Sequence, residues 1–168
     1  KRLLFKVIYQ GLLSRNIILP FTKNVRYIFL FHDVSPESAA HHHPVYSTKP
    51  EVFQKITEWI EKNFKIVGLD ELTDENYSDD KSQNLASIAF DDGFISLSDF
   101  VFPYLNQKQI PFTVFVNQNA IQENWLWCNN LLMAARQNNE KYLRKIYEQF
   151  APEMSFSEFA ADPVTCLS

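Results

Sequence analysis

Four short apolar runs lie in the first two thirds of the chain, separated by polar or helix-like segments. They occupy residues 27–31, 65–69, 86–90 and 112–116. The run 86–90 shows no alternation with polar residues, which is typical of a strand covered on both faces, as in a parallel sheet. Runs of this kind, with helical patterns between them, predict an α/β domain of mainly parallel, neighbouring strands.

Apolar residues at helical spacing predict the elements between these strands. Residues 48–51, Thr-Lys-Pro-Glu, have the spacing of a capping box with proline in the first turn. The helix that follows should bury an apolar face made of Phe53, Ile56, Trp59 or Ile60, and Phe64. A second helix is marked by Leu97, Val101, Tyr104 and Leu105, and Pro103 should kink it or lie near its first turn.

The two ends of the chain carry weaker patterns. Residues 1–13 are apolar at helical spacing and include Lys1, Arg2 and Lys6, which predicts a helix packed on the domain's own surface. A signal peptide and a membrane-surface helix are the alternatives, and no run is long enough to span a bilayer. Residues 131–150 look helical. We therefore expect a protein that is cytoplasmic or peripheral to the membrane, with no transmembrane span.

The chemistry is expected where the run 86–90 ends, in Asp91, Asp92 and Gly93. Successive strand residues point to opposite faces, so two adjacent carboxylates can take different tasks. Gly93 lets the chain turn steeply, and the C-terminal strand ends of α/β folds are where ligands bind. Asp-Gly is also a common hairpin turn, but the segment after it has helical spacing. The pattern therefore favours a functional acidic pair.

Polar residues also follow two other runs. His32 and Asp33 come directly after 27–31, and Asn117 follows 112–116. Because parallel strands end at the same edge of a sheet, His32 and Asp92 are expected to lie close enough for one ion or substrate to bridge them. Asn117 is expected to line the same site.

Composition and the remaining candidate residues narrow the class of protein. A hydrophobic content of 46% excludes general disorder, and a net charge of −4 without a basic stripe gives no support for nucleic acid as a partner. Cys128 and Cys166 have no metal spacing and are expected to be free thiols in a reducing compartment, with a disulfide between them as the alternative. Three consecutive histidines cannot all converge on one ion, so a solvated loop is expected rather than a metal site at His41, His42 and His43.

The sequence AFDDGF at 89–94, with PFTVFV at 111–116, resembles the first motif and next strand of the NodB-homology polysaccharide deacetylases, carbohydrate esterase family 4. FHDV at 31–34 and KPEVF at 49–53 resemble the first strand end and first helix start of the same family. The four matches occur in the family's order. The resemblance implies an incomplete distorted (β/α) barrel.

The resemblance also implies a domain plan. Residues 1–168 would be a single domain, the N-terminal portion of the deacetylase domain. Within it, 1–24 would be a leading helix and linker, 25–120 the motif-bearing β/α core, and 121–168 a helical insertion or tail. The open sheet edge that such a portion leaves would be covered by a second copy or by the missing C-terminal part.

The activity implied is metal-dependent hydrolysis of acetyl groups on N-acetylated or O-acetylated polysaccharide. Asp91 would be the general base, and Asp92 would bind the metal, typically zinc. The pair's repulsion without a cation should raise its apparent pKa. Near-site roles in contact with the glycan substrate would fall to His32, Asp33, Gly93 and Asn117.

One part of the family pattern is missing. The family completes its metal site with two histidines on a later loop, and no histidine follows His43. The chain is expected either to be truncated or to be a degenerate member that binds glycan without turnover, and to be inactive or very weak as it stands. An aspartate-cluster phosphoryl receiver domain is a third, low-ranked interpretation, because it would need a strand-end lysine that the sequence does not supply.

Overall fold

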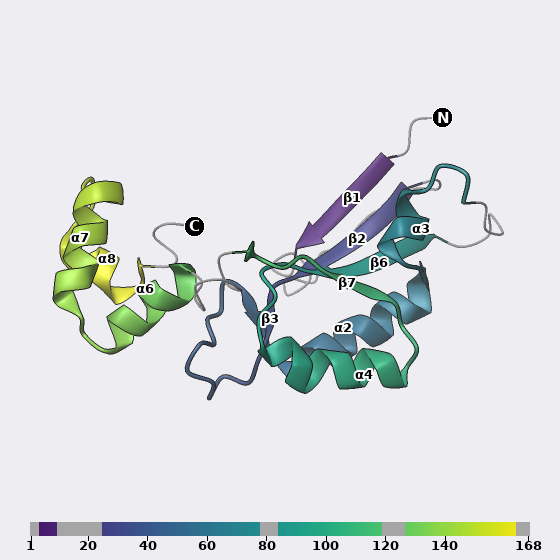
Figure 1. The fold of residues 1–168 in the computed structure, drawn as a ribbon, viewed down its shortest axis with the longest axis horizontal. Helices are drawn as coiled ribbons and strands as arrows, with labels where there is room; N and C mark the ends of the chain where they lie inside the picture. The colour runs from purple at the N-terminus through teal and green to yellow at the C-terminus, as the bar shows by residue number, and fades with distance from the viewer. Residues whose placement is uncertain (1–3, 10–24, 78–83, 119–126, 164–168) are drawn as a thin grey trace.

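A computed structural model describes residues 4–9, 25–77, 84–118 and 127–163 (Figure 1). The strands among them are β1 Leu4–Tyr9, β2 Val25–Phe31, β3 Asp33–Val34, β4 Ser47–Thr48, β5 Lys65–Ile66, β6 Leu85–Phe90 and β7 Phe112–Val114. The helices are α2 Pro50–Asn63, α3 Leu69–Thr73, a π-helical turn η1 Leu97–Val101, α4 Phe102–Gln107, α6 Trp127–Arg136, α7 Glu140–Phe150 and α8 Phe156–Ala161.

The main sheet is parallel at every pairing within the described residues. Its order is β1-β2-β6-β5, and β7 also pairs with β6. Strand β2 pairs along one edge of β6. The other edge of β6 is shared by two strands, with β5 beside its start and β7 beside its end. The predicted parallel α/β domain is therefore confirmed, although the strand expected at 65–69 ends at Ile66 and Leu69 begins α3. The sheet does not close within the described residues, so the barrel stays an expectation.

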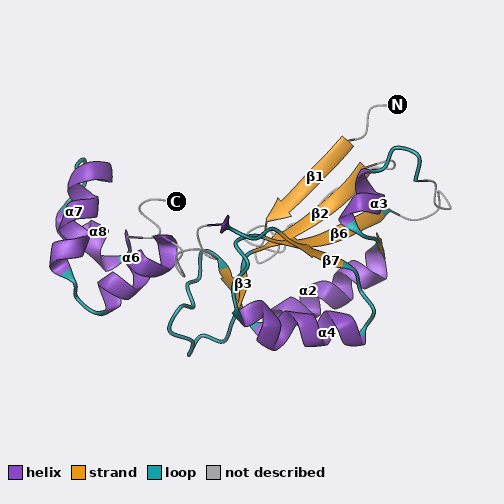
Figure 2. Ribbon diagram, viewed as in Figure 1, coloured by secondary structure: helices purple, strands orange, loops and turns teal. Residues whose placement is uncertain are grey.

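Helices α2 and α4 cover one face of this sheet (Figure 2). Alternate residues of β2 are buried, and these include Phe29 and Phe31. The ring of Phe31 lies 5.2 Å from that of Phe53 in α2 and 5.6 Å from that of Phe90 in β6. Edge-to-face and offset aromatic contacts of this kind add to the free energy gained from burying the rings. Bulky aromatic packing therefore fixes the register of the strands that carry the candidate site.

The expected helix at the start of the chain is wrong, because Leu4–Tyr9 forms β1 and pairs in parallel with β2. The sequence LFKVIY is a short apolar run rich in aromatic and β-branched residues, which are favoured in strands. A run this short also satisfies helical spacing, so periodicity alone does not separate the two states.

The helices follow their sequence signals with three corrections. Pro50 is the first residue of α2 as predicted, but no side chain caps the helix, and Thr48 pairs in β4 instead. Trp59 keeps 39% of its surface exposed, although its ring contacts Phe29 edge-on. Residues 131–150 form parts of two helices, because Asn138 adopts a positive φ of 52° and ends the first. Pro103 lies in the first turn of α4, as predicted.

Helices α6, α7 and α8 pack on one another through buried apolar residues, among them Leu131, Leu143 and Phe159. We call them the helical unit. No helix among the described residues is long and apolar enough to cross a membrane. Two predicted features, packing of Trp125 and a free thiol at Cys166, fall on residues outside those described.

Candidate functional site

The candidate site lies where three neighbouring strands end. Phe31, Phe90 and Val114 form the last paired rung across β2, β6 and β7. The residues that follow them directly are His32 after β2, Asp91 after β6 and Phe115 after β7. The Asp91 amide donates to the Phe31 carbonyl at 2.9 Å, and the Phe115 amide donates to the Phe90 carbonyl at 2.7 Å. These hydrogen bonds place all three residues side by side at the C-terminal edge of the sheet.

The turn after β6 needs an unusual backbone. Asp92 and Gly93 have positive φ angles of 68° and 69°. Asp tolerates this left-handed region better than most residues, and glycine adopts it without steric cost. A Cβ at Gly93 would lie 3.0 Å from Cγ1 of Val116, closer than ordinary van der Waals contact, so Val116 would have to shift to admit a side chain. Backbone strain concentrated at an acidic turn is a common feature of functional sites.

His32 and Asp92 meet across the strand ends, as predicted. His32 Nδ1 lies 3.1 Å from Asp92 Oδ2, and both side chains are about 30% exposed. The hydrogen bond to Asp92 raises the pKa of His32, and the negative charges of Asp92 and Asp91 raise it further against the opposing effect of burial. The imidazole therefore keeps its proton to a higher pH than an isolated histidine would.

Asp91 has a raised pKa, and its chief cause differs from the expected one. Burial of the carboxyl is the largest effect, while the charge of His32 lowers the pKa and that of Asp92 raises it. Repulsion between the two carboxylates was expected to dominate, but it is the smallest of the three effects. A carboxyl whose pKa moves toward neutrality is a better proton acceptor in catalysis than one at its ordinary value.

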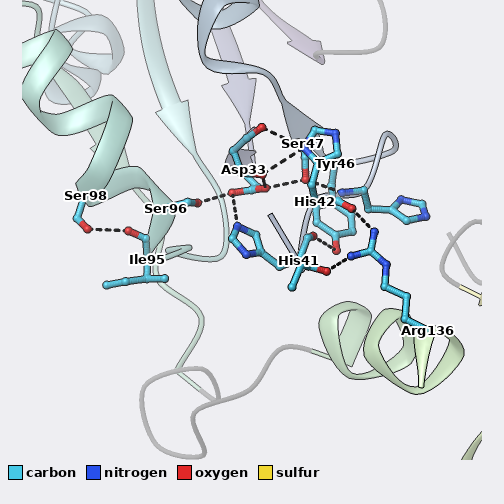
Figure 3. A network of polar contacts seen from close by, with 12 residues as sticks. Asp33, His41, His42, Tyr46, Ser47, Ile95, Ser96, Ser98 and Arg136 are labelled. Atoms are coloured by element: carbon cyan, nitrogen blue, oxygen red, sulfur yellow. Dashed lines mark hydrogen bonds and ion pairs between the residues drawn. The ribbon is translucent and has the colours of Figure 1, made fainter. Parts of the chain in front are cut away.

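Asp33 lies beneath this edge and is fully buried. Its carboxylate accepts hydrogen bonds from Ser35 Oγ at 2.5 Å, from Ser47 Oγ at 2.6 Å and from Ser96 Oγ (Figure 3). Ser96 belongs to the segment that follows the acidic turn. Asp33 thus joins the end of β2 to the segment after β6, below the surface that a substrate would reach.

The triple-histidine loop is not solvated, so that expectation is wrong for two of its members. His42 and His43 are 8% and 5% exposed. His42 Nδ1 lies 3.0 Å from the Ser35 carbonyl, and His43 Nε2 lies 3.1 Å from Asp162 Oδ1. The partner of His43 is 119 positions away in sequence, so the pattern of the loop itself does not reveal this contact.

The helical unit holds this loop in place. Arg136, at the end of α6, donates to the carbonyls of Ala40 and His42, the latter at 2.9 Å (Figure 3). With the contact between His43 and Asp162, two separate interactions link the loop to the helical unit. Sequence reasoning missed Arg136, because nothing in the local pattern around it signals a partner some ninety residues earlier.

The described residues do not make a complete zinc site. No group of three or more His, Cys, Asp or Glu side chains within them is arranged to hold a metal ion. His32 Nδ1 and Asp92 are already bonded to each other. A catalytic zinc ion needs three protein ligands as a rule, so the donor set in the described part of the chain does not fit one.

Comparison with known proteins supports the sequence resemblance. Residues 78–153 match the sequence model of the family described as polysaccharide deacetylase, a range that includes β6, the acidic turn and β7. The predicted resemblance is therefore confirmed over this part of the chain. No curated protein matches the sequence.

A solved structure is also similar to the chain. It is a de-N-acetylase from Aggregatibacter actinomycetemcomitans, with a TM-score of 0.43 and 15% sequence identity. The similarity covers 53% of this chain and 36% of that protein, so the chain spans about a third of that protein's length.

Proposed function

We propose that this chain carries part of the active site of a polysaccharide deacetylase, with Asp91 as the general base. The substrate would be an N-acetylated or O-acetylated glycan. The observation that carries the proposal is the placement of Asp91 between His32 and Phe115 at the end of three parallel strands. The match of residues 78–153 to the polysaccharide deacetylase family supports the same assignment.

The proposed reaction is hydrolysis of the acetyl group. Water attacks the acetyl carbonyl carbon while its proton passes to Asp91. The bond from that carbon to the sugar nitrogen or oxygen then breaks, and the leaving nitrogen or oxygen takes the proton from Asp91, so that the products are acetate and the free amine or hydroxyl of the sugar. The raised pKa of Asp91 suits it to accept this proton. The pKa of His32 is raised by Asp92, and in its protonated form His32 places a positive charge beside the carboxylates, where it can stabilise negative charge that develops on the carbonyl oxygen.

A divalent metal, zinc by the family resemblance, is part of the expectation for the whole protein, with Asp92 as one ligand. The described residues do not complete such a site. The roles proposed here are therefore those of the chain's own side chains: Asp91 moves the proton, and Asp92 orients His32.

Acetate release from acetylated chito-oligosaccharides tests this function in the full-length protein. Asp91→Asn should lower kcat by about 10²–10⁴-fold, because it removes the base and keeps the shape. Asp99→Asn is the matched control, because Asp99 is an exposed carboxylate in η1 whose side chain meets its neighbour Ser98. Full activity in Asp91→Asn would overturn the proposal.

A second candidate is glycan binding without turnover, and the incomplete donor set among the described residues favours it. The two functions separate in one experiment that measures acetate release beside oligosaccharide binding by calorimetry. Binding with no acetate release from the full-length protein would establish the binding function and reject the hydrolase.

A further inference from the structure

We propose that Phe115 and Val116 form the apolar wall of the candidate site and contact the sugar ring that carries the acetyl group. We call these two residues the apolar wall. The proposal rests on the proposed function and extends it, because it assigns recognition of the glycan ring to residues that no polar motif marks.

The position of Phe115 follows from the strand register. Val114 pairs with Phe90, and the Phe115 amide donates to the Phe90 carbonyl at 2.7 Å. Phe115 is therefore the neighbour of Asp91 on one side, as His32 is on the other. Adjacent strands lie about 4.8 Å apart, so a substrate that reaches the Asp91 carboxylate comes within contact of the residue beside it.

Val116 extends the wall along the acidic turn. Its Cγ1 lies 3.0 Å from the point where a Cβ on Gly93 would stand, so the valine packs directly against the glycine backbone. The missing side chain at Gly93 is what allows this approach. The wall therefore borders both Asp91 and the turn that follows it.

Both residues of the wall are open to solvent. Phe115 is 48% exposed and Val116 is 54% exposed, although the residues just before them on β7 pack against the core. The two side chains are adjacent in sequence and present apolar surface next to the titratable groups at the strand ends. Ligand sites combine such apolar surface with a few convergent polar groups.

The charged residues beside the apolar wall, Asp91 and His32, favour a sugar over a protein surface as the ligand. A second protein surface placed on the wall would also cover Asp91 and His32 and remove water from charged groups, which is costly. An acetylated pyranose avoids this cost, because its hydroxyl and carbonyl groups can hydrogen-bond to the charged residues. Its C–H face and acetyl methyl are apolar and fit against an aromatic ring.

Binding of chito-oligosaccharide to the full-length protein tests the wall independently of turnover. In the Asp91→Asn background, Phe115→Ala should weaken binding about tenfold, because the ring loses its apolar contact. Phe115→Trp should restore binding. Phe150→Ala is the matched control, since Phe150 is 59% exposed at the end of α7, and its binding should be unchanged.

Steady-state acetate release adds the second readout. Phe115→Ala should raise KM about tenfold and change kcat less, since it alters sugar binding and keeps the base. Unchanged binding and KM in Phe115→Ala, with normal acetate release, would reject the wall and leave the proposed function standing. Oligosaccharide binding that depends on Phe115, without acetate release from the wild type, would reject the hydrolase and keep the wall. Absence of both binding and release would reject both.

Discussion

His32 and Asp92 are sixty positions apart in sequence, and their side chains are joined by a 3.1 Å contact between Nδ1 and Oδ2. The contact joins the ends of β2 and β6, so it forms only when these two strand ends lie side by side. Because it also raises the pKa of His32, it can be followed by titration in solution.

The first prediction concerns the protonation of His32. Its imidazole should titrate above the ordinary value of 6.5, and Asp92→Asn should lower its pKa, because both the charged hydrogen bond and the adjacent negative charge are lost. NMR titration of the histidine ring protons measures both values. Asp99→Asn, which changes an exposed carboxylate in η1, should leave the His32 pKa unaltered.

The same contact makes folding stability depend on pH. A histidine whose folded pKa is raised adds stability that is fully present below pH 6.5 and is lost as the pH rises through the folded pKa. His32→Gln should therefore destabilise the protein more at pH 5.5 than at pH 8.5 in urea unfolding. An equal loss at both pH values would mean that the contact with Asp92 does not persist in solution.

The second prediction concerns Asp91. Its raised pKa lowers the stability of the folded protein at neutral pH. A carboxyl whose pKa is raised by folding carries its negative charge less favourably in the folded protein than in the unfolded chain. The folding stability therefore falls as the pH rises from the ordinary pKa of 3.8 through the pKa of the folded state. Asp91→Asn should therefore raise the free energy of unfolding at pH 7, by less than about 1 kcal/mol because the carboxyl is only partly buried and solvent screens its charge. The gain should vanish near pH 3.

Comparing Asp91→Asn with Asp99→Asn separates the effect of the candidate site on the free energy of unfolding from the general effect of removing a carboxylate. A variant that gains stability while losing acetate release would show that the site holds an ionised carboxylate at the expense of the fold, as functional sites often do. Loss of stability in Asp91→Asn at pH 7 would contradict the assigned pKa direction.

The third prediction concerns the buried carboxylate of Asp33. Asp33→Ala removes the common acceptor of three hydroxyl groups in the interior, those of Ser35, Ser47 and Ser96. A hydrogen bond to a charged group contributes about 1.5–3 kcal/mol, so urea unfolding should show a loss of at least this size. Asp33→Asn keeps an acceptor oxygen and should cost less. Asp99→Ala, the control at an exposed carboxylate, should change the free energy of unfolding by less than about 0.5 kcal/mol.

The sequence predicts the strands and the acidic turn because their signals are local. Continuous apolar runs mark 27–31 and 86–90, and the polar residues that follow each run mark the edge where they meet. The same pattern predicts that His32 and Asp92 lie close together. Parallel topology makes this inference possible, since all strand ends of one direction lie at one edge.

The rest could not be predicted, because it depends on contacts between distant segments. Burial of His42 and His43 depends on Ser35, Asp162 and Arg136, which share no local pattern with them. Residues 4–9 satisfy both helical and strand patterns, and pairing with β2 decides between them. Thr48 has the spacing of a helix cap, but strand pairing with β3 holds its backbone elsewhere.

The last prediction concerns the glycine of the acidic turn. Gly93 has a φ of 69°, and a methyl group there would meet Val116 at 3.0 Å. Gly93→Ala should therefore lower the free energy of unfolding by about 1–2 kcal/mol, through the left-handed backbone and the contact together. It should also move Asp92 away from His32, because the turn must shift to make room. The His32 pKa should fall toward 6.5 in the NMR titration.

Gly68→Ala is the matched control for this prediction. Gly68 has a negative φ of −59°, and the atom nearest to its hypothetical Cβ is the carboxylate oxygen of Asp70, at the end of a side chain that can rotate away. Gly68→Ala should leave the His32 pKa unchanged and cost little stability. If Gly93→Ala matched Gly68→Ala in both stability and the His32 pKa, the acidic turn would not require glycine. The close packing of Val116 on that turn, on which the apolar wall depends, would then be wrong.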